Sequence, residues 1–80
     1  NLHHLELFHV VAQEGNVCRA ARRLGVSQPA VSRQIHELEE SLGLPLFERL
    51  PRGVRPTEAG EALAAHARAL FAMREHASRD

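Results

Sequence analysis

The sequence has one cysteine, no lysine and no long apolar run, and each shortage limits what the chain can be. Cys18 has no second cysteine to pair with, which excludes an internal disulfide and fits a reducing compartment. Roughly 18 consecutive apolar residues are needed to span a bilayer, and the longest candidate, residues 62–72, is interrupted by His66 and Arg68. No charged-then-apolar leader is present either. We therefore expect a cytoplasmic protein that does not enter a membrane.

The chain also has little of what an enzyme or a metal site needs. Its 80 residues make one small domain, without a glycine-rich phosphate loop or a nucleophile elbow. The six histidines include no pair three or four residues apart, and Cys18 has no CxxC partner. We predict no catalytic residue, no metal and no cofactor in this domain. Cys18 is interpreted as a small buried core residue, with a redox sensor beside Arg19 and Arg22 as the alternative.

The net charge is zero, which by itself argues against a nucleic-acid partner. The distribution argues the other way, because residues 16–57 hold seven arginines against four glutamates, a local charge of +3. All ten basic residues are arginine, whose guanidinium suits two-bond contacts to phosphate or guanine. A GC-rich genome would explain the same bias. The chain begins at Asn1 without a methionine, so we expect it to be a fragment of a longer protein.

Apolar residues at helical spacing predict two helices in the first 25 residues. The first carries Leu5, Phe8 and Ala12 on its inward side and stops at Gly15. Asn16 can cap a second, short helix that ends at Gly25. The inward residues of this short helix are Val17, Ala20, Ala21 and Leu24.

A third helix follows at once. Ser27 is its predicted N-cap, Pro29 lies in its first turn, where a missing N–H costs nothing, and Gly43 ends it. Its inward stripe is Val31, Ile35, Leu38 and Leu42. Because only Gly25 and Val26 join the second and third helices, the two must cross sharply, which is helix-turn-helix spacing.

The pattern changes after Gly43. Residues 44–56 contain prolines and a glycine between short apolar stretches, which predicts two short strands around a turn, with Gly53 allowing the tip to bend tightly. Thr57 can cap a last helix, and Glu58 and Glu61 stand favourably near its positive end. That helix is expected to run close to the end of the chain.

Burying the inward stripe leaves a polar face on the third helix that suits a DNA groove. Arginine can bond twice to guanine, glutamine twice to adenine, and serine to a base or a phosphate. No acid precedes Glu37 in this helix, so its N-terminal half can approach phosphates without repulsion, and its dipole favours that approach. The predicted base contacts are Gln28, Pro29, Ser32 and Arg33.

Contacts to the DNA backbone are predicted on either side of this helix. Arginines of the second helix would position the domain on phosphates, and arginines of the strand pair would reach the backbone or an adjacent minor groove. The predicted backbone contacts are Arg19, Arg22, Arg23, Ser27, His36, Arg49, Arg52 and Arg55. For all of them the alternative is a solvated polar surface, and Ser27 is first of all a helix cap.

The last helix carries a second stripe, at the spacing of a two-helix seam. Its members are Ala59, Leu63, His66, Leu70, Met73 and Ala77. A helix of about 20 residues outruns a small core, so we predict a homodimer through Leu63, His66, Leu70 and Met73. The alternative is packing onto the domain's own core, a role that suits Phe71.

With the helices placed, several spaced blocks resemble the N-terminal DNA-binding domain of the LysR-type transcriptional regulator family. The blocks are AARRL at 20–24, VSQPAVS at 26–32, Ile35, Leu38-Glu39, Leu42-Gly43, LFER at 46–49 and TEAG at 57–60. The resemblance covers essentially the whole chain. It implies a mainly α fold, in which residues 1–57 form a winged helix-turn-helix with a short two-stranded β wing and residues 58–80 form a long linker and dimerisation helix.

The resemblance further implies a bacterial regulator that binds an interrupted inverted repeat in double-stranded DNA as a homodimer, and as a tetramer in the full-length protein. A small-molecule effector would bind a separate C-terminal domain that this sequence does not contain. The family's DNA contacts carry over to Gln28, Pro29, Ser32 and Arg33 on the third helix and to Arg49 and Arg52 on the wing.

Two positions depart from the family pattern. Cys18 stands where a large apolar or hydroxyl residue is usual, and Pro56 replaces the usual leucine before Thr57, which makes contacts from Arg55 the least secure. Molybdate-responsive regulators share a similar domain and are one alternative. A helical dimerisation module without DNA contact is the other.

Overall fold

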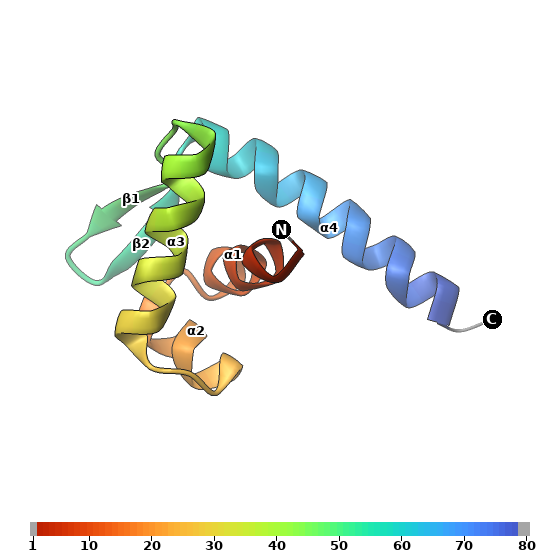
Figure 1. The fold of residues 1–80 in the computed structure, drawn as a ribbon, viewed down its shortest axis with the longest axis horizontal. Helices are drawn as coiled ribbons and strands as arrows, with labels where there is room; N and C mark the ends of the chain where they lie inside the picture. Colours follow the sequence, from red (N-terminus) through yellow and green to blue (C-terminus); the bar gives the residue numbers. More distant parts are fainter. Residues whose placement is uncertain (1, 79–80) are drawn as a thin grey trace.

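The computed structural model describes the backbone of residues 2–78 and the side chains of residues 3–73. The elements are α1 (Leu2–Glu14), α2 (Val17–Leu24), α3 (Gln28–Leu42), β1 (Phe47–Leu50), β2 (Gly53–Pro56) and α4 (Glu58–Ser78). In Figure 1 the first three helices gather together, the strand pair projects on one side, and α4 leaves toward the other. The predicted mainly helical fold with a two-stranded wing is confirmed.

Side-chain caps and glycines set the helix boundaries in the first half of the chain. The Asn16 side-chain oxygen accepts a hydrogen bond from the Arg19 amide at 2.9 Å, so Asn16 caps α2. Ser27 Oγ accepts from the Ala30 amide at 3.3 Å and caps α3 in the same way. Between them Gly25 has a φ of 72°, the left-handed conformation that ends α2. The predicted helix-turn-helix is confirmed with both of its caps.

The core lies where α1 meets the other three helices. Phe8 and Val11 of α1 and Val31 of α3 have no exposed surface, and Leu46 before β1 is buried with them. The other buried apolar residues are Leu7, Ala20, Ala21, Ile35, Ala64 and Ala67. Small alanines on α2 and α4 let these helices approach their neighbours closely. This packing decides which sides of α2 and α3 face solvent.

Two residues predicted to lie inside are exposed. Leu42 is 48% exposed, because the last turn of α3 runs past α1 (Figure 1), whereas Leu38 one turn earlier still packs against the core. Cys18 is exposed as well, since Ala20 and Ala21 occupy the buried side of α2. The predictions for Leu42 and Cys18 are therefore wrong.

The wing is an antiparallel pair whose tip is the two-residue turn Pro51–Arg52. Gly53 does not bend this tip, because its φ is not positive, which corrects the sequence-based interpretation. A side chain there is excluded for another reason: a Cβ on Gly53 would overlap the carbonyl oxygen of Gly15. The Val54 amide donates to that same oxygen at 3.0 Å. Gly53 is thus the point where β2 lies against the turn between α1 and α2.

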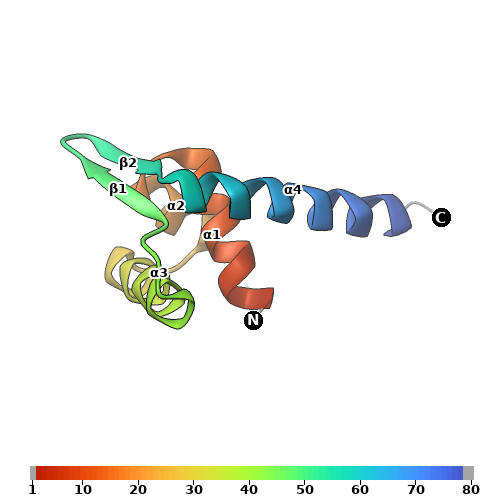
Figure 2. The ribbon, with the colours of Figure 1, turned by 90° about the horizontal axis from the view of Figure 1, so that it is seen from above.

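Helix α4 starts against the domain and then extends away from it, as Figure 2 shows from above. The Thr57 hydroxyl oxygen accepts a hydrogen bond from the Gly60 amide at 3.1 Å, which confirms the predicted cap. Ala64 and Ala67 are buried in the core, and the Phe71 ring lies 4.9 Å from that of His9. The predicted division of the chain into residues 1–57 and 58–80 stays a prediction, and residues 79–80 and the side chain of Ala77 lie outside the described residues.

Candidate nucleic-acid interface

The front end of α3 presents a polar surface to solvent. Val31 and Ile35 point into the core and fix the rotation of the helix, so Gln28, Pro29 and Arg33 are exposed. No acidic residue lies in the first turn of α3, and within the described residues Arg33 forms no ion pair. The free amide groups at a helix N-terminus favour an anion such as phosphate. Three of the four predicted base contacts are therefore accessible.

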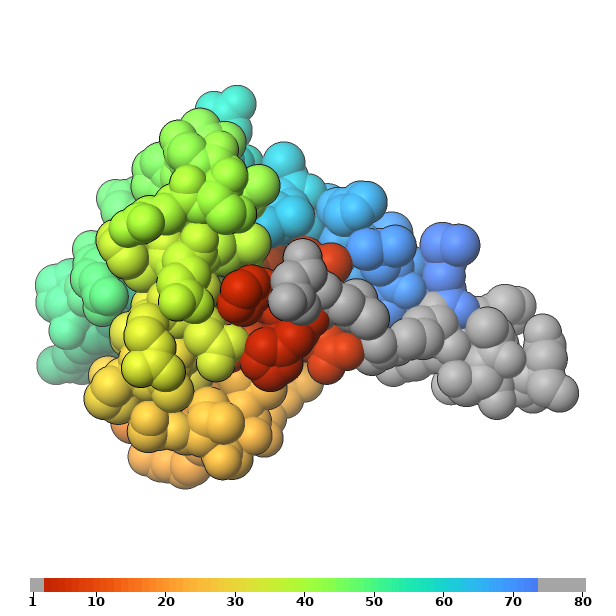
Figure 3. All heavy atoms as spheres, in the orientation of Figure 1, coloured from red at the N-terminus to blue at the C-terminus, as the bar shows by residue number. Residues whose placement is uncertain are grey.

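Ser32, the fourth predicted base contact, is half-buried. It lines a cavity of about 180 Å³ between α3 and the wing, together with His36 of α3 and Phe47, Arg49 and Val54 of the strands. Ser32 therefore faces the space between the helix and β1, not the outermost side of α3. In Figure 3 the spheres of α3 lie directly beside those of the wing, so one ligand can touch both.

The arginines of α2 divide into two kinds. Arg19 and Arg22 are exposed, and Arg22 Nη2 lies 3.8 Å from Cys18 Sγ. Arg23 instead forms an ion pair with Glu14 of α1, with Nη1 3.2 Å from Oε2. Its guanidinium is thus partly compensated within the chain.

The three wing arginines also differ, because neighbouring residues of a strand point to opposite faces. Arg55 lies directly across from Glu48 and pairs with it at 2.8 Å. Arg49 is on the other face, beside the cavity at Ser32, and Arg52 is at the tip. Of these three arginines, Arg52 lies in the turn at the tip, and Arg49 and Arg55 lie within the strands.

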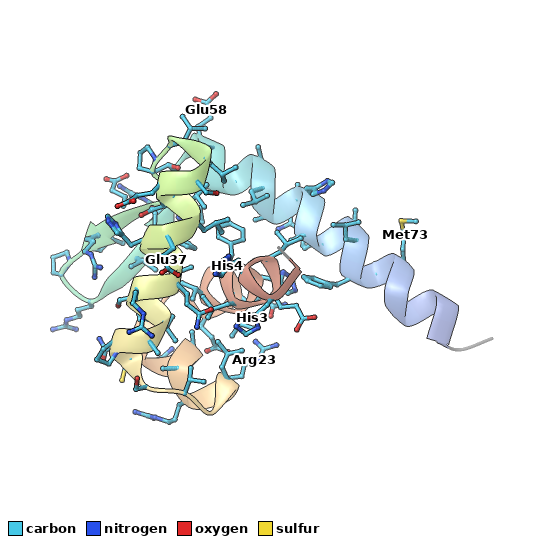
Figure 4. The ribbon with its side chains drawn as sticks, in the orientation of Figure 1. His3, His4, Arg23, Glu37, Glu58 and Met73 are labelled. Carbon is cyan, nitrogen blue, oxygen red and sulfur yellow. The ribbon has the colours of Figure 1, made fainter. Side chains whose placement is uncertain are left out.

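The acidic half of α3 is more structured than its sequence suggests. Glu40 Oε1 lies 2.7 Å from His36 Nε2, and Glu37 Oε1 lies 3.8 Å from His4 Nε2 on α1. Figure 4 shows His4 and Glu37 facing each other across the two helices. Each of these contacts is an ion pair only when its histidine is protonated. His36, a predicted contact to the DNA backbone, is exposed and lies next to Glu40.

Glu39 is a site residue that the sequence analysis missed. One of its carboxylate oxygens, Oε2, accepts hydrogen bonds from the Leu46 amide at 2.7 Å and the Phe47 amide at 3.2 Å. Both bonds are partly buried, and Phe47 is the first residue of β1. In the sequence Glu39 was only one acid among three, and nothing in its spacing shows that it turns toward the next element.

Asn16 has a second contact that the sequence did not predict. Besides capping α2, its amide nitrogen lies 3.5 Å from the carbonyl oxygen of Arg52 at the wing tip. The wing is therefore held from two sides, at β1 by α3 and at β2 by the turn between α1 and α2.

His9 is the described residue whose acid-base behaviour is most clearly changed by its surroundings. Burial lowers the pKa of His9 most, and the nearby charges of Arg23 and Arg68 lower it further. His9 is a residue of α1 that faces α4, with its ring 4.9 Å from that of Phe71, and it does not belong to the polar surface of α3.

The described residues offer neither a metal site nor a membrane-spanning helix. No group of three or more histidine, cysteine or acidic side chains is placed to hold a metal ion there. No helix in that part of the chain is long and apolar enough to cross a membrane.

The chain is similar to known DNA-binding regulators. A family model described as bacterial regulatory helix-turn-helix protein, lysR family, matches residues 2–61. The HTH-type transcriptional regulator BudR of Klebsiella aerogenes is 50% identical over 76 residues, which cover 95% of this chain and 53% of BudR. The chain thus spans about half the length of that relative. The names of the relatives agree with the prediction that this chain is not an enzyme.

Two solved structures extend the similarity to protein–DNA complexes. The DNA-binding domain of CbnR, crystallised with DNA, matches with a TM-score of 0.87 and 39% identity, covering 99% of this chain and 91% of that chain. The BenM domain in complex with catB site 1 DNA matches with a TM-score of 0.90 and 37% identity, covering 99% and 88%.

Proposed function

Because this chain belongs to the lysR family of bacterial regulatory helix-turn-helix proteins, we propose that it binds double-stranded operator DNA as the DNA-binding domain of a transcriptional regulator. The family match confirms the resemblance found in the sequence and favours it over a molybdate-type regulator. The observation that carries the proposal is the exposed, acid-free front end of α3. This end would enter the major groove first, as the second helix of a helix-turn-helix does.

Direct base contacts are assigned to the front of α3. Arg33 can bond twice to guanine and Gln28 twice to adenine, and both are exposed. Pro29 offers an apolar contact beside them. Ser32 would touch DNA from the edge of the cavity between α3 and β1.

Backbone contacts are assigned by the freedom of each side chain. Arg19, Arg22, Arg49 and Arg52 are exposed and form no ion pair within the described residues, so they can neutralise phosphates directly. Ser27 lies at the helix N-terminus, where phosphate is favoured. Arg23, Arg55 and His36 would first have to release the acids Glu14, Glu48 and Glu40.

A homodimer through α4 would present two copies of α3 to successive major grooves of an interrupted inverted repeat. His66, Leu70 and Met73 are exposed, and Met73 points away from the domain in Figure 4. Leu63 packs partly against the domain's own core and would contribute less. In the full-length regulator we propose a cytoplasmic protein, a tetramer, and a small-molecule effector bound outside this domain.

Two substitutions test the assignment by their different effects on binding. Arg33→Ala should relax base preference and cost ~1–3 kcal/mol of binding free energy, because a two-bond contact to one base is lost. Arg52→Ala should weaken binding to all sequences and flatten the dependence on salt by about one phosphate contact. Fluorescence anisotropy with specific and random duplexes over a range of salt concentrations measures both.

Arg68→Ala is the matched control, since it removes the same charge from α4, away from the proposed surface. Binding should not change in this variant. If duplex binding is absent at low salt, the chain is a helical dimerisation module without DNA contact. If Arg33→Ala and Arg52→Ala both bind like the wild type, the proposed contacts of these two residues are wrong.

A further inference from the structure

We propose that Glu39 is a positioning residue of the DNA-binding surface: its carboxylate fixes the start of β1 against α3 and so sets where Arg49 stands beside Ser32. This inference rests on the proposed function. It concerns a residue that makes no DNA contact itself, because its carboxylate is turned toward the chain's own backbone.

The Glu39 carboxylate is hydrogen-bonded to the backbone where the wing begins. Its Oε2 atom accepts from two successive amides, at 2.7 Å from Leu46 and 3.2 Å from Phe47. Hydrogen bonds to a carboxylate are roughly twice as strong as those between neutral groups, and more so when partly buried. One oxygen of α3 is therefore bonded to both amides at the start of the wing.

Glu39 lies on the same face of α3 as Ser32. Seven residues, almost two full turns, separate it from Ser32, so the two lie on one face of α3. Both line the cavity of about 180 Å³ that separates α3 from the wing, and Arg49 lines it from β1. The wing is thus pinned to α3 at the Glu39 end of this space and stands apart from it toward Ser32, where the DNA would lie.

The other attachments of the wing come from elements other than α3. The Val54 amide is bonded to the Gly15 carbonyl, and the Arg52 carbonyl to the Asn16 side chain. These bonds hold β2 and the tip to the turn between α1 and α2. The start of β1 is also held by the Thr57 amide, which donates to the Leu46 carbonyl at 3.0 Å, and by the Phe47 ring, 5.2 Å from that of Phe8 on α1. Among the hydrogen bonds of the described residues, those of Glu39 tie β1 directly to α3.

A double-mutant cycle between Glu39 and Arg49 tests the inference, with affinity for a specific duplex as the readout. In the wild type, Arg49→Ala should weaken binding about fivefold, the loss expected for one phosphate contact. In a Glu39→Ala background the same change should weaken it by less than about twofold, because Arg49 no longer stands where it reaches the DNA. Arg52→Ala is the internal comparison and should have the same effect in both backgrounds.

Three further variants separate the effect of the length of the Glu39 side chain from the effect of its charge and from a failure to fold. Glu39→Gln keeps the length and one acceptor oxygen, so it should retain most of the Arg49 effect. Glu39→Asp keeps the charge but is one methylene shorter, so it should lose that effect, and it serves as the test variant if Glu39→Ala does not fold. Glu37→Gln removes an exposed charge from the same helix and should leave the cycle as in the wild type.

Two results would overturn the inference. One is an unchanged Arg49 effect in folded Glu39→Ala or Glu39→Asp protein. The other is an equal fall in the Arg49 and Arg52 effects, which would mean general loosening of the domain and no specific positioning. If instead neither arginine affects binding in the wild type and Arg33→Ala is also silent, the proposed DNA binding has failed, and that outcome is distinct from both.

Discussion

Single residues decide how much of the positive charge is available to DNA. Ten arginines balance ten acids in the whole chain, yet the pairs visible in the structure are selective. Arg23 and Arg55 are each bonded to a glutamate, whereas Arg33 and Arg52 have no such partner within the described residues. A zero net charge is therefore compatible with a locally positive surface.

His9 gives a prediction for the pH dependence of stability. Its pKa is lowered in the folded chain, by burial first and then by Arg23 and Arg68, while the unfolded chain titrates near the ordinary value of 6.5. The unfolded state then binds more protons below that pH, so the free energy of unfolding should fall as the pH drops through 6.5 toward the lowered value. Glu61 also lines the pocket beside His9.

The measurement is urea unfolding of the wild type and of His9→Gln between neutral and mildly acidic pH. The variant should lose part of the pH dependence, because glutamine does not titrate. Identical profiles for wild type and His9→Gln would show that His9 does not contribute.

At the scale of elements, the helices and the wing could be predicted from the sequence pattern. The hydrogen bonds and packing contacts between these elements could not. Caps at Asn16, Ser27 and Thr57 are local, since each side chain bonds an amide three residues ahead. The burial of Leu42 was predicted wrongly, because helical spacing does not show where the neighbouring helix ends. Glu39 was missed for a related reason: its partners are seven and eight residues away, in another element.

The candidate site could also be predicted only in part. The exposed front of α3 follows from the buried stripe alone, because Val31 and Ile35 fix the helix rotation. Which arginines are paired with acids depends on tertiary contacts, such as that between Arg23 and Glu14. Gly53 shows the same limit. A glycine is required there because the Gly15 carbonyl approaches β2 closely, and not because of the turn beside it.

The junction between the wing and α4 gives a prediction at the scale of elements. The Thr57 hydroxyl donates to the Pro45 carbonyl at 2.7 Å and accepts from the Gly60 amide, so it both caps α4 and ties it to the segment before β1. Ser27 makes only the cap, at 3.3 Å. Thr57→Ala should therefore lower the free energy of unfolding by about 2 kcal/mol and Ser27→Ala by about 1 kcal/mol.

Urea unfolding of the two variants measures this difference directly. Both substitutions delete a hydroxyl at a helix start, and Thr57→Ala deletes a methyl group as well. Thr57→Ser keeps the hydroxyl and loses only the methyl group, so it is the control for the bond to Pro45. An equal or larger loss in Ser27→Ala would mean that the bond between Thr57 and Pro45 adds nothing to stability.

At the scale of the whole molecule, α4 has apolar side chains on two of its sides. Ala64 and Ala67 pack into the domain, while Leu70 is 37% and Met73 69% exposed on a neighbouring side. Apolar side chains on a helix that extends beyond its own core are typical of a helix–helix interface. The proposed dimer would cover them.

Leu70→Glu tests that dimer, because a charge in an apolar seam should separate the two copies. We expect the variant to sediment as a monomer at a concentration where the wild type sediments as a dimer. Ala65→Glu, which puts the same charge on an exposed position away from the stripe, should remain dimeric. Leu63→Glu is a poorer test, since Leu63 also packs against the core. Equal sedimentation of wild type and Leu70→Glu would remove the proposed seam.

The central claim is that the front end of α3, with the wing beside it, is the surface that meets DNA. Titration of the isotope-labelled chain with a specific duplex, followed through its backbone amide resonances, maps that surface most directly. We predict the largest shifts in residues 27–36 and 49–53, and small ones in residues 61–72. Large shifts confined to α4, or no shifts at saturating duplex, would contradict the account.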